Sequence, residues 1–150
     1  MPSLRRDGHP RQRVWLRFLC SVFLLWSAAS VAAQDWEELR NRADAAYASS
    51  DWAVALAEYE KLVSLFPEEG CLHSRLGGCA LREPGRLNMA RRHLGIAMRS
   101  NCEEADLEFH RARLAHLEYD FSKARDLYAA YLETGGKKAR FRTEAMVWEQ

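Results

Sequence analysis

A spacing of about 34 residues runs through the chain and constrains its fold more than any other feature. Three alanines, Ala55, Ala90 and Ala124, are separated by 35 and then 34 residues. Three larger side chains have the same two separations: Tyr59, Leu94 and Tyr128. A period of this length indicates that one supersecondary unit is repeated and stacked on its copies.

Each repeating unit has a helical pattern. Neither glycine nor proline interrupts residues 35–49, 52–66 or 103–134, the run 87–101 contains only Gly95, and apolar residues recur in these runs at helical spacing. Turn signals occur at residues 49–51, 67, 82–86, around 101, 119–120 and 135–136. The pattern predicts an all-α chain of short antiparallel helix pairs.

A second set of positions fixes where the repeats differ in length. Ala43, Gly77 and Ala112 are separated by 34 and then 35 residues, the reverse order of the alanines above. The extra residue therefore lies in the Pro84-Gly85 turn. We expect these small residues to let the first helix of each pair approach the second closely, because overpacking such a contact costs about 1–3 kcal/mol.

Larger residues have complementary positions in the repeat. We expect Tyr59, Leu94 and Tyr128 to contact the next helix pair. The residue that begins the second helix of each pair, Trp52, Leu87 or Phe121, is expected to fill the wedge beside the turn. Pro67 ends the helix before it because proline has no N–H group to continue the hydrogen bonds.

The chain thus resembles the tetratricopeptide repeat family, which has small residues at fixed positions of a 34-residue period and a terminal proline. The resemblance divides residues 34–138 into repeats 36–69, 70–104 and 105–138, and it implies a right-handed solenoid with a capping helix at 139–150. Cys102 and Gly136 replace the final proline, and Arg42 and Arg111 replace a usual leucine. Helical hairpins unrelated to this family are the alternative.

A narrower resemblance concerns the runs RLGGCAL (75–81) and LEFHRARLAHLEYDFSKARDLYAAYLE (107–133). They are similar to the repeats that begin certain bacterial cell-envelope proteins. A β-propeller of short repeats and a peptidoglycan-binding domain usually follow in those proteins, and neither pattern follows here. The chain is therefore interpreted either as a stand-alone adaptor or as a shortened relative.

The first 33 residues have the composition of an export signal. An arginine-rich lead precedes an uncharged run at 18–33, which closes on Val31-Ala32-Ala33. We therefore expect a secretory signal peptide, cleaved after Ala33. An uncleaved anchor is the alternative, although the uncharged run is shorter than the about 20 apolar residues of a membrane span. Export implies the periplasm or the inner face of the outer membrane.

Export makes the cysteines informative, because disulfides persist in oxidising compartments. The exported chain would keep Cys71, Cys79 and Cys102. Cys71 and Cys79 are too far apart on one helix to bond. Cys71 and Cys102 each precede a helix pair at the same end of the fold, where a bridge is one alternative. Cys79 is interpreted as a small apolar residue of a helix.

No arrangement in the sequence favours catalysis, a metal or a cofactor. The acidic pairs at 37–38, 68–69 and 103–104 all lie where a helix begins, and negative charge is stabilised there. Histidines 73, 93, 110 and 116 lack the three- or four-residue spacing of helical metal ligands. The net charge of +1 argues against a nucleic-acid partner.

The family resemblance also implies a binding surface, because the first helices of such repeats line a concave face. Its groove positions correspond here to Arg40, Asp44, Tyr47, Ser74, Gly78, Arg82, Phe109, Arg113 and His116. Aromatic residues and arginine are enriched at protein-binding hot spots. The three arginines are expected to hold an acidic segment. The alternative is that these residues pack on the capping helix or on a neighbouring copy.

Two functional hypotheses follow. The first is a non-catalytic adaptor of the bacterial cell envelope that binds a protein or peptide on the concave face. The second is a structural module that forms a homo-oligomer through its open C-terminal end, at Met146 and Trp148.

Overall fold

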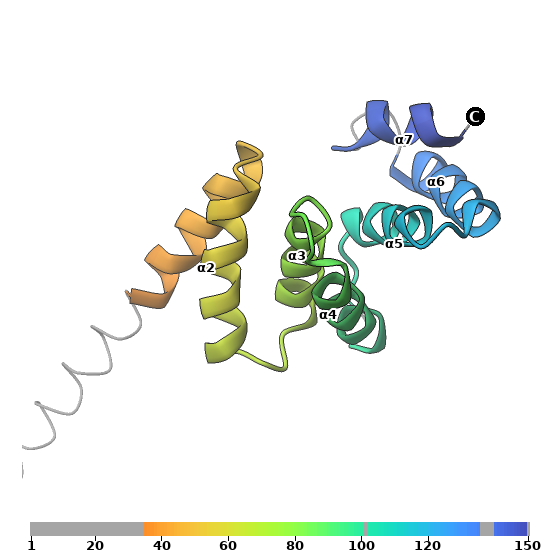
Figure 1. Cartoon of the computed structure of the whole chain (residues 1–150). Coiled ribbons are helices and arrows are strands. Elements are labelled where there is room, and N and C mark those ends of the chain that lie inside the picture. The colour runs from red at the N-terminus through yellow and green to blue at the C-terminus, as the bar shows by residue number, and fades with distance from the viewer. Residues whose placement is uncertain (1–34, 101, 136–139, 150) are drawn as a thin grey trace, which may run out of the picture. The chain divides into compact units, whose positions relative to one another are not determined.

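The computed structural model describes residues 35–100, 102–135 and 140–149 (Figure 1). The chain divides into two compact units, Met1–Glu38 and Leu39–Gln150. Only residues 35–38 of the first unit are described, so the expected signal peptide at 1–33 lies outside the described residues. In the part of the chain that is described, no helix has both the length and the apolar character needed to cross a membrane.

Helices, and no strands, occupy the described residues, so the prediction of an all-α chain is confirmed for them. A first helix covers residues 35–48. It is followed by α2 (Trp52–Leu65), α3 (Gly70–Ala80), α4 (Leu87–Arg99), α5 (Asp106–Leu117), α6 (Phe121–Gly135) and α7 (Arg142–Glu149). Figure 1 shows α3 beside α4 and α5 beside α6, and contacts between the members of each pair are extensive.

The turns before α2 and α6 have the same construction. Ser50 and Tyr119 adopt left-handed backbone conformations, with φ of 63° and 64°. The residue after each donates its N–H to a carbonyl five positions earlier: Asp51 to Ala46 at 2.9 Å and Asp120 to Ala115 at 3.0 Å. The turn between α3 and α4 is longer, and Gly85 has a φ of 76° there. The extra residue inferred from the repeat spacing falls in this longer turn.

Small residues lie where helices approach closely. A Cβ added to Gly77 of α3 would lie 2.7 Å from Cγ of Leu94 in α4, so any larger residue there would displace the leucine. A Cβ on the neighbouring Gly78 would overlap the ring of His110 in α5. The nine positions expected to pack the repeats are all buried: Ala43, Ala55, Tyr59, Gly77, Ala90, Leu94, Ala112, Ala124 and Tyr128.

The residues that begin the second helices differ in their surroundings. Trp52 and Leu87 are partly buried against the core. Phe121 is 56% exposed, so the expectation that it fills a wedge is wrong. Its ring instead packs edge-to-face on the rings of His116 and Tyr119 at the surface.

A disulfide joins Cys71, at the start of α3, to Cys102, in the connection before α5. The two Cα atoms are 5.2 Å apart, within the range that disulfides require. Cys79 of α3 is a buried free thiol, and burial raises its pKa to about 12. The thiolate needed for reaction is therefore scarce at Cys79 near neutral pH.

Candidate interaction site

A first charged cluster joins the helix over residues 39–48 to α3 and to the connection before α5. Arg40 donates to both carboxylate oxygens of Glu69, at 3.0 and 2.6 Å. Arg75 of α3 donates to Asp44 at 2.5 Å and to Glu104 at 2.6 Å. Both arginines are two-thirds or more shielded from solvent, so these pairs are stronger than fully exposed ones. They hold successive first helices together.

A second charged cluster involves α7. The carboxylate of Glu144 accepts hydrogen bonds from Arg82 at 2.7 Å and from Arg113. The two arginine side chains are only 15% and 21% exposed. Burial lowers the pKa of Arg113, nearby Arg82 lowers it further, and Glu144 opposes both effects. Two partly buried guanidinium groups thus share a single carboxylate, and they would repel each other without it.

Aromatic rings surround this second cluster. Phe141 stacks on Phe109, with ring centroids 4.4 Å apart and planes inclined by 16°. The guanidinium group of Arg82 lies over the rings of Trp52 and Phe141, at 5.0 and 5.3 Å. Arg140 lies 4.3 Å above the ring of Tyr47 and donates to that residue's carbonyl oxygen. Cation–π contacts of partly desolvated arginines are each worth about 0.5–2 kcal/mol.

These contacts show that residues 140–148, which we term the C-terminal segment, cover the predicted groove. Phe141 and Ala145 of this segment are buried. The segment touches predicted groove residues of three different first helices: Tyr47 before α2, Arg82 after α3, and Phe109, Arg113 and His116 of α5. Of the two roles considered for these residues, packing on a C-terminal helix is the one present in this structure.

Four of the predicted groove residues need correction, because they are buried: Tyr47, Ser74, Gly78 and Phe109. They offer no surface to a partner in this structure. Arg140 lies over the ring of Tyr47 and Phe141 stacks on Phe109, in addition to ring contacts within the helix pairs. Arg40 and Asp44 are partly exposed but hold the ion pairs described above, and Arg82, Arg113 and His116 contact the C-terminal segment.

A buried histidine lies beneath this site. His110 of α5 is 1% exposed, and its Nε2 is 2.8 Å from the hydroxyl oxygen of Tyr47. Burial lowers its pKa to about 3, and the positive charges of Arg82 and Arg113 add to this effect. The neutral ring therefore lets the helices pack beside an arginine-rich surface. Gly78 is the one partial sign of this histidine in the sequence, because it provides the space that the ring occupies.

A pair of stacked histidines lies between α3 and α4. Nε2 of His73 is 2.9 Å from the carbonyl oxygen of Pro67, so it must donate its proton there. Nδ1 of His73 lies 2.7 Å from Nδ1 of His93, within hydrogen-bonding distance. Nε2 of His93 in turn accepts from Arg92, at 3.3 Å. Burial lowers the pKa of His93 to about 4, and the nearby His73 and Arg92 lower it further, so this ring is neutral in the folded chain near neutral pH.

The lowered pKa values of His93 and His110 predict that the protein loses stability in mild acid. In the unfolded chain both histidines have a pKa near 6.5, so below that pH the unfolded state binds protons that the folded state does not. The free energy of unfolding should fall between pH 6.5 and 5, by up to about 1.4 kcal/mol per pH unit for each histidine. The contribution of the two histidines to the free energy of unfolding is fully present above pH 7. The His93 contribution stops falling below its folded pKa of about 4.

Urea unfolding at pH 7.5, 6.5, 5.5 and 5.0 measures this slope, in a window where most carboxylates stay ionised. The His93→Gln variant removes one of the two protons taken up on unfolding. Its slope should be close to half that of the unchanged chain. An identical slope in the variant would mean that His93 carries a proton in the folded state.

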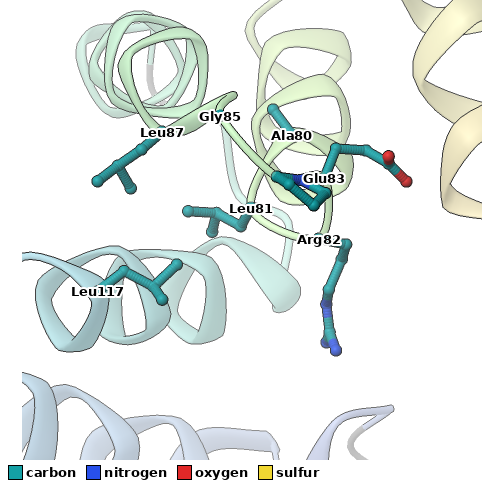
Figure 2. A pocket seen from close by; sticks show the side chains of 8 residues that line it. Ala80, Leu81, Arg82, Glu83, Gly85, Leu87 and Leu117 are labelled. Carbon is teal, nitrogen blue, oxygen red and sulfur yellow. The ribbon is translucent and has the colours of Figure 1, made fainter.

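Two pockets flank the covered groove. Figure 2 shows the first, of about 280 Å³, in which Leu81, Leu87 and Leu117 face a common space while Arg82 extends away from them. The second, of about 480 Å³, lies beside Glu144 between Trp52, Arg82 and Arg140. No group of three histidine, cysteine or carboxylate side chains suited to a metal ion occurs among the described residues.

No model of a known protein family matches this chain, and no curated protein matches it in sequence.

Proposed function

We propose that the protein is a non-catalytic adaptor that binds a segment of another protein on the face formed by the first helices of its helix pairs. One observation carries the proposal: Arg82 and Arg113, from two different helix pairs, converge on one carboxylate beside the rings of Phe109 and Trp52. Arginine and aromatic residues dominate protein-binding hot spots. Their combination here suits an acidic helical segment.

The proposal includes membership of the tetratricopeptide repeat family and its right-handed solenoid of three helix pairs. The 34-residue spacing, the burial of small residues at that spacing and the matching turns before α2 and α6 support it. Proteins of this kind bind other proteins along extended concave surfaces. The residue boundaries 36–69, 70–104 and 105–138 remain predictions.

We further propose that the adaptor is exported and acts in the bacterial cell envelope. The pattern of residues 1–33 is one argument. The bond between Cys71 and Cys102 is another, because disulfides persist outside reducing compartments.

Site-directed variants test the binding function. An affinity-tagged full chain and its Arg82→Gln and Arg113→Gln variants are expressed in a Gram-negative host and cross-linked in the intact envelope. We expect each variant to lower the recovery of a defined cross-linked partner by about tenfold or more. Arg125→Gln is the matched control, because Arg125 is exposed and lies on α6. Equal recovery by all four proteins would refute binding at this site.

The second candidate function is self-association through α7. Met146, Val147 and Trp148 are 46%, 63% and 44% exposed, an apolar surface that a second copy could cover. Light scattering over a hundredfold range of concentration decides this question. A dimer that the Val147→Lys substitution dissociates supports self-association, and a monomer throughout the range excludes it.

A further inference from the structure

The C-terminal segment is held by contacts that a separate peptide could make. Phe141 lies against Phe109, Glu144 binds two arginines, and the indole of Trp148 packs edge-to-face on His116, 4.4 Å between centroids. These are side-chain contacts to residues far away in the sequence. Glu144 is 62 residues from Arg82 and 31 from Arg113.

The underlying surface has the composition of an interface. We term it the receptor surface and define it by Tyr47, Trp52, Arg82, Phe109, Arg113 and His116. Glu144 and Trp148 remain 27% and 44% exposed while they contact it, so the segment is only partly enclosed. An aromatic anchor surrounded by partly solvated ion pairs is the arrangement of a protein–protein interface, with a buried centre and a polar rim.

A helix as short as α7 has little stability by itself. It contains eight residues, and isolated helices below about 12 residues are marginal in water. Its place therefore depends on the receptor surface and on its contacts with α6. A segment that supplies an aromatic ring and a carboxylate at the same spacing would satisfy the same two arginines. The pocket beside Glu144 leaves room for such a segment to make first contact.

We propose that the receptor surface binds a helical segment of a partner protein that carries an aromatic residue and, three residues later, a carboxylate, and that the C-terminal segment is its built-in competitor. This inference rests on the proposed function and specifies its partner chemistry. The competitor acts from within the same chain, at an effective concentration in the millimolar range. The partner segment consequently binds the unchanged chain more weakly than a chain whose own segment is released.

A peptide in trans tests the inference. The probe is a fluorescein-labelled peptide with the sequence of residues 140–149, and fluorescence anisotropy measures its binding to the full chain. The Glu144→Gln variant loses both ion pairs of the internal competitor, so we expect it to bind the peptide at least tenfold more tightly than the unchanged chain. Adding Arg82→Gln and Arg113→Gln to that variant should abolish binding, whereas adding Arg125→Gln should not.

Two matched peptides test the recognition chemistry. A peptide with the Glu144→Gln substitution should lose at least tenfold in affinity. A peptide with Thr143→Ala should bind like the parent, because Thr143 is exposed on α7. If the Glu144→Gln chain does not bind the parent peptide, or binds both altered peptides equally, the inference is overturned. The cross-linking experiment does not use this peptide, so a partner that binds Arg82 and Arg113 through other chemistry would keep the adaptor function while this inference fails.

Hydrogen exchange provides a second measurement that needs no variant. Excess parent peptide should accelerate amide exchange in α7 of the unchanged chain by at least tenfold, because the displaced helix loses its protection. Exchange of α7 that stays as slow as that of α6 at saturating peptide would contradict the inference.

The oligomeric state provides a further test. A dimer that the peptide converts to monomers would identify a second copy of this chain as the occupant, and it would overturn the assignment to a different partner.

Discussion

Replacing Phe109 with alanine is expected to lower the free energy of unfolding by about 3–5 kcal/mol. The side chain is 0% exposed. Its ring centroid lies 4.4 Å from that of Phe141, 5.5 Å from that of Tyr131 and 5.7 Å from that of Tyr128. Truncation would leave a cavity between rings that are themselves tied to α6 and the C-terminal segment. Urea unfolding at pH 7.5 measures the effect.

Phe121→Ala is the matched control, because it makes the same chemical change at a phenylalanine that is 56% exposed. We expect this variant to lower the free energy of unfolding by less than about 1 kcal/mol, as most surface substitutions do. The pair distinguishes two interpretations of Phe109. If the free energy of unfolding falls equally little in both variants, Phe109 is a solvent-facing groove residue, as the repeat pattern predicts. Its burial beneath Phe141 then does not hold in solution.

The second large effect concerns the disulfide. Replacing Cys71 and Cys102 together with serine releases a link across a sequence separation of 31 residues. The unfolded chain then gains conformational entropy, so the free energy of unfolding should fall by about 3–4 kcal/mol. Urea unfolding of the oxidised chain and of the double variant measures the difference.

Reductant supplies the control for this prediction. Dithiothreitol should lower the unfolding midpoint of the unchanged chain to that of the double variant, and it should leave the variant unaffected. The Cys79→Ala variant should keep its response to reductant, because Cys79 takes no part in the bond. A midpoint of the unchanged chain that does not respond to reductant would show that the bond is absent or contributes nothing.

Local patterns made the helices predictable. The expected second helices at 52–66 and 87–101 correspond to α2 and α4 within two residues. Caps and turns near the helix ends set these bounds, as when Asp51 accepts a hydrogen bond from the N–H of Val54 at 3.3 Å. The small residues at Ala55 and Ala90 were also predictable to be buried, because their spacing places them on one recurring helix face.

The groove residues were harder to interpret, because their surroundings depend on a segment distant in sequence. Nothing in the spacing of the repeats indicates that Phe141 covers Phe109 or that Glu144 reaches Arg82. The same pattern, arginine beside aromatic residues, is produced by a surface that awaits a partner and by one that already holds part of its own chain. Only the position of α7 distinguishes the two.

The contact between Gly78 and His110 should leave a trace in evolution. A methyl group at position 78 would overlap the imidazole ring, so the two sites are sterically coupled although 32 positions separate them in the sequence. Homologues that gain a side chain at position 78 should have exchanged the imidazole at position 110 for something smaller. Such paired exchanges would mark which helical-repeat proteins share the helix geometry of this chain.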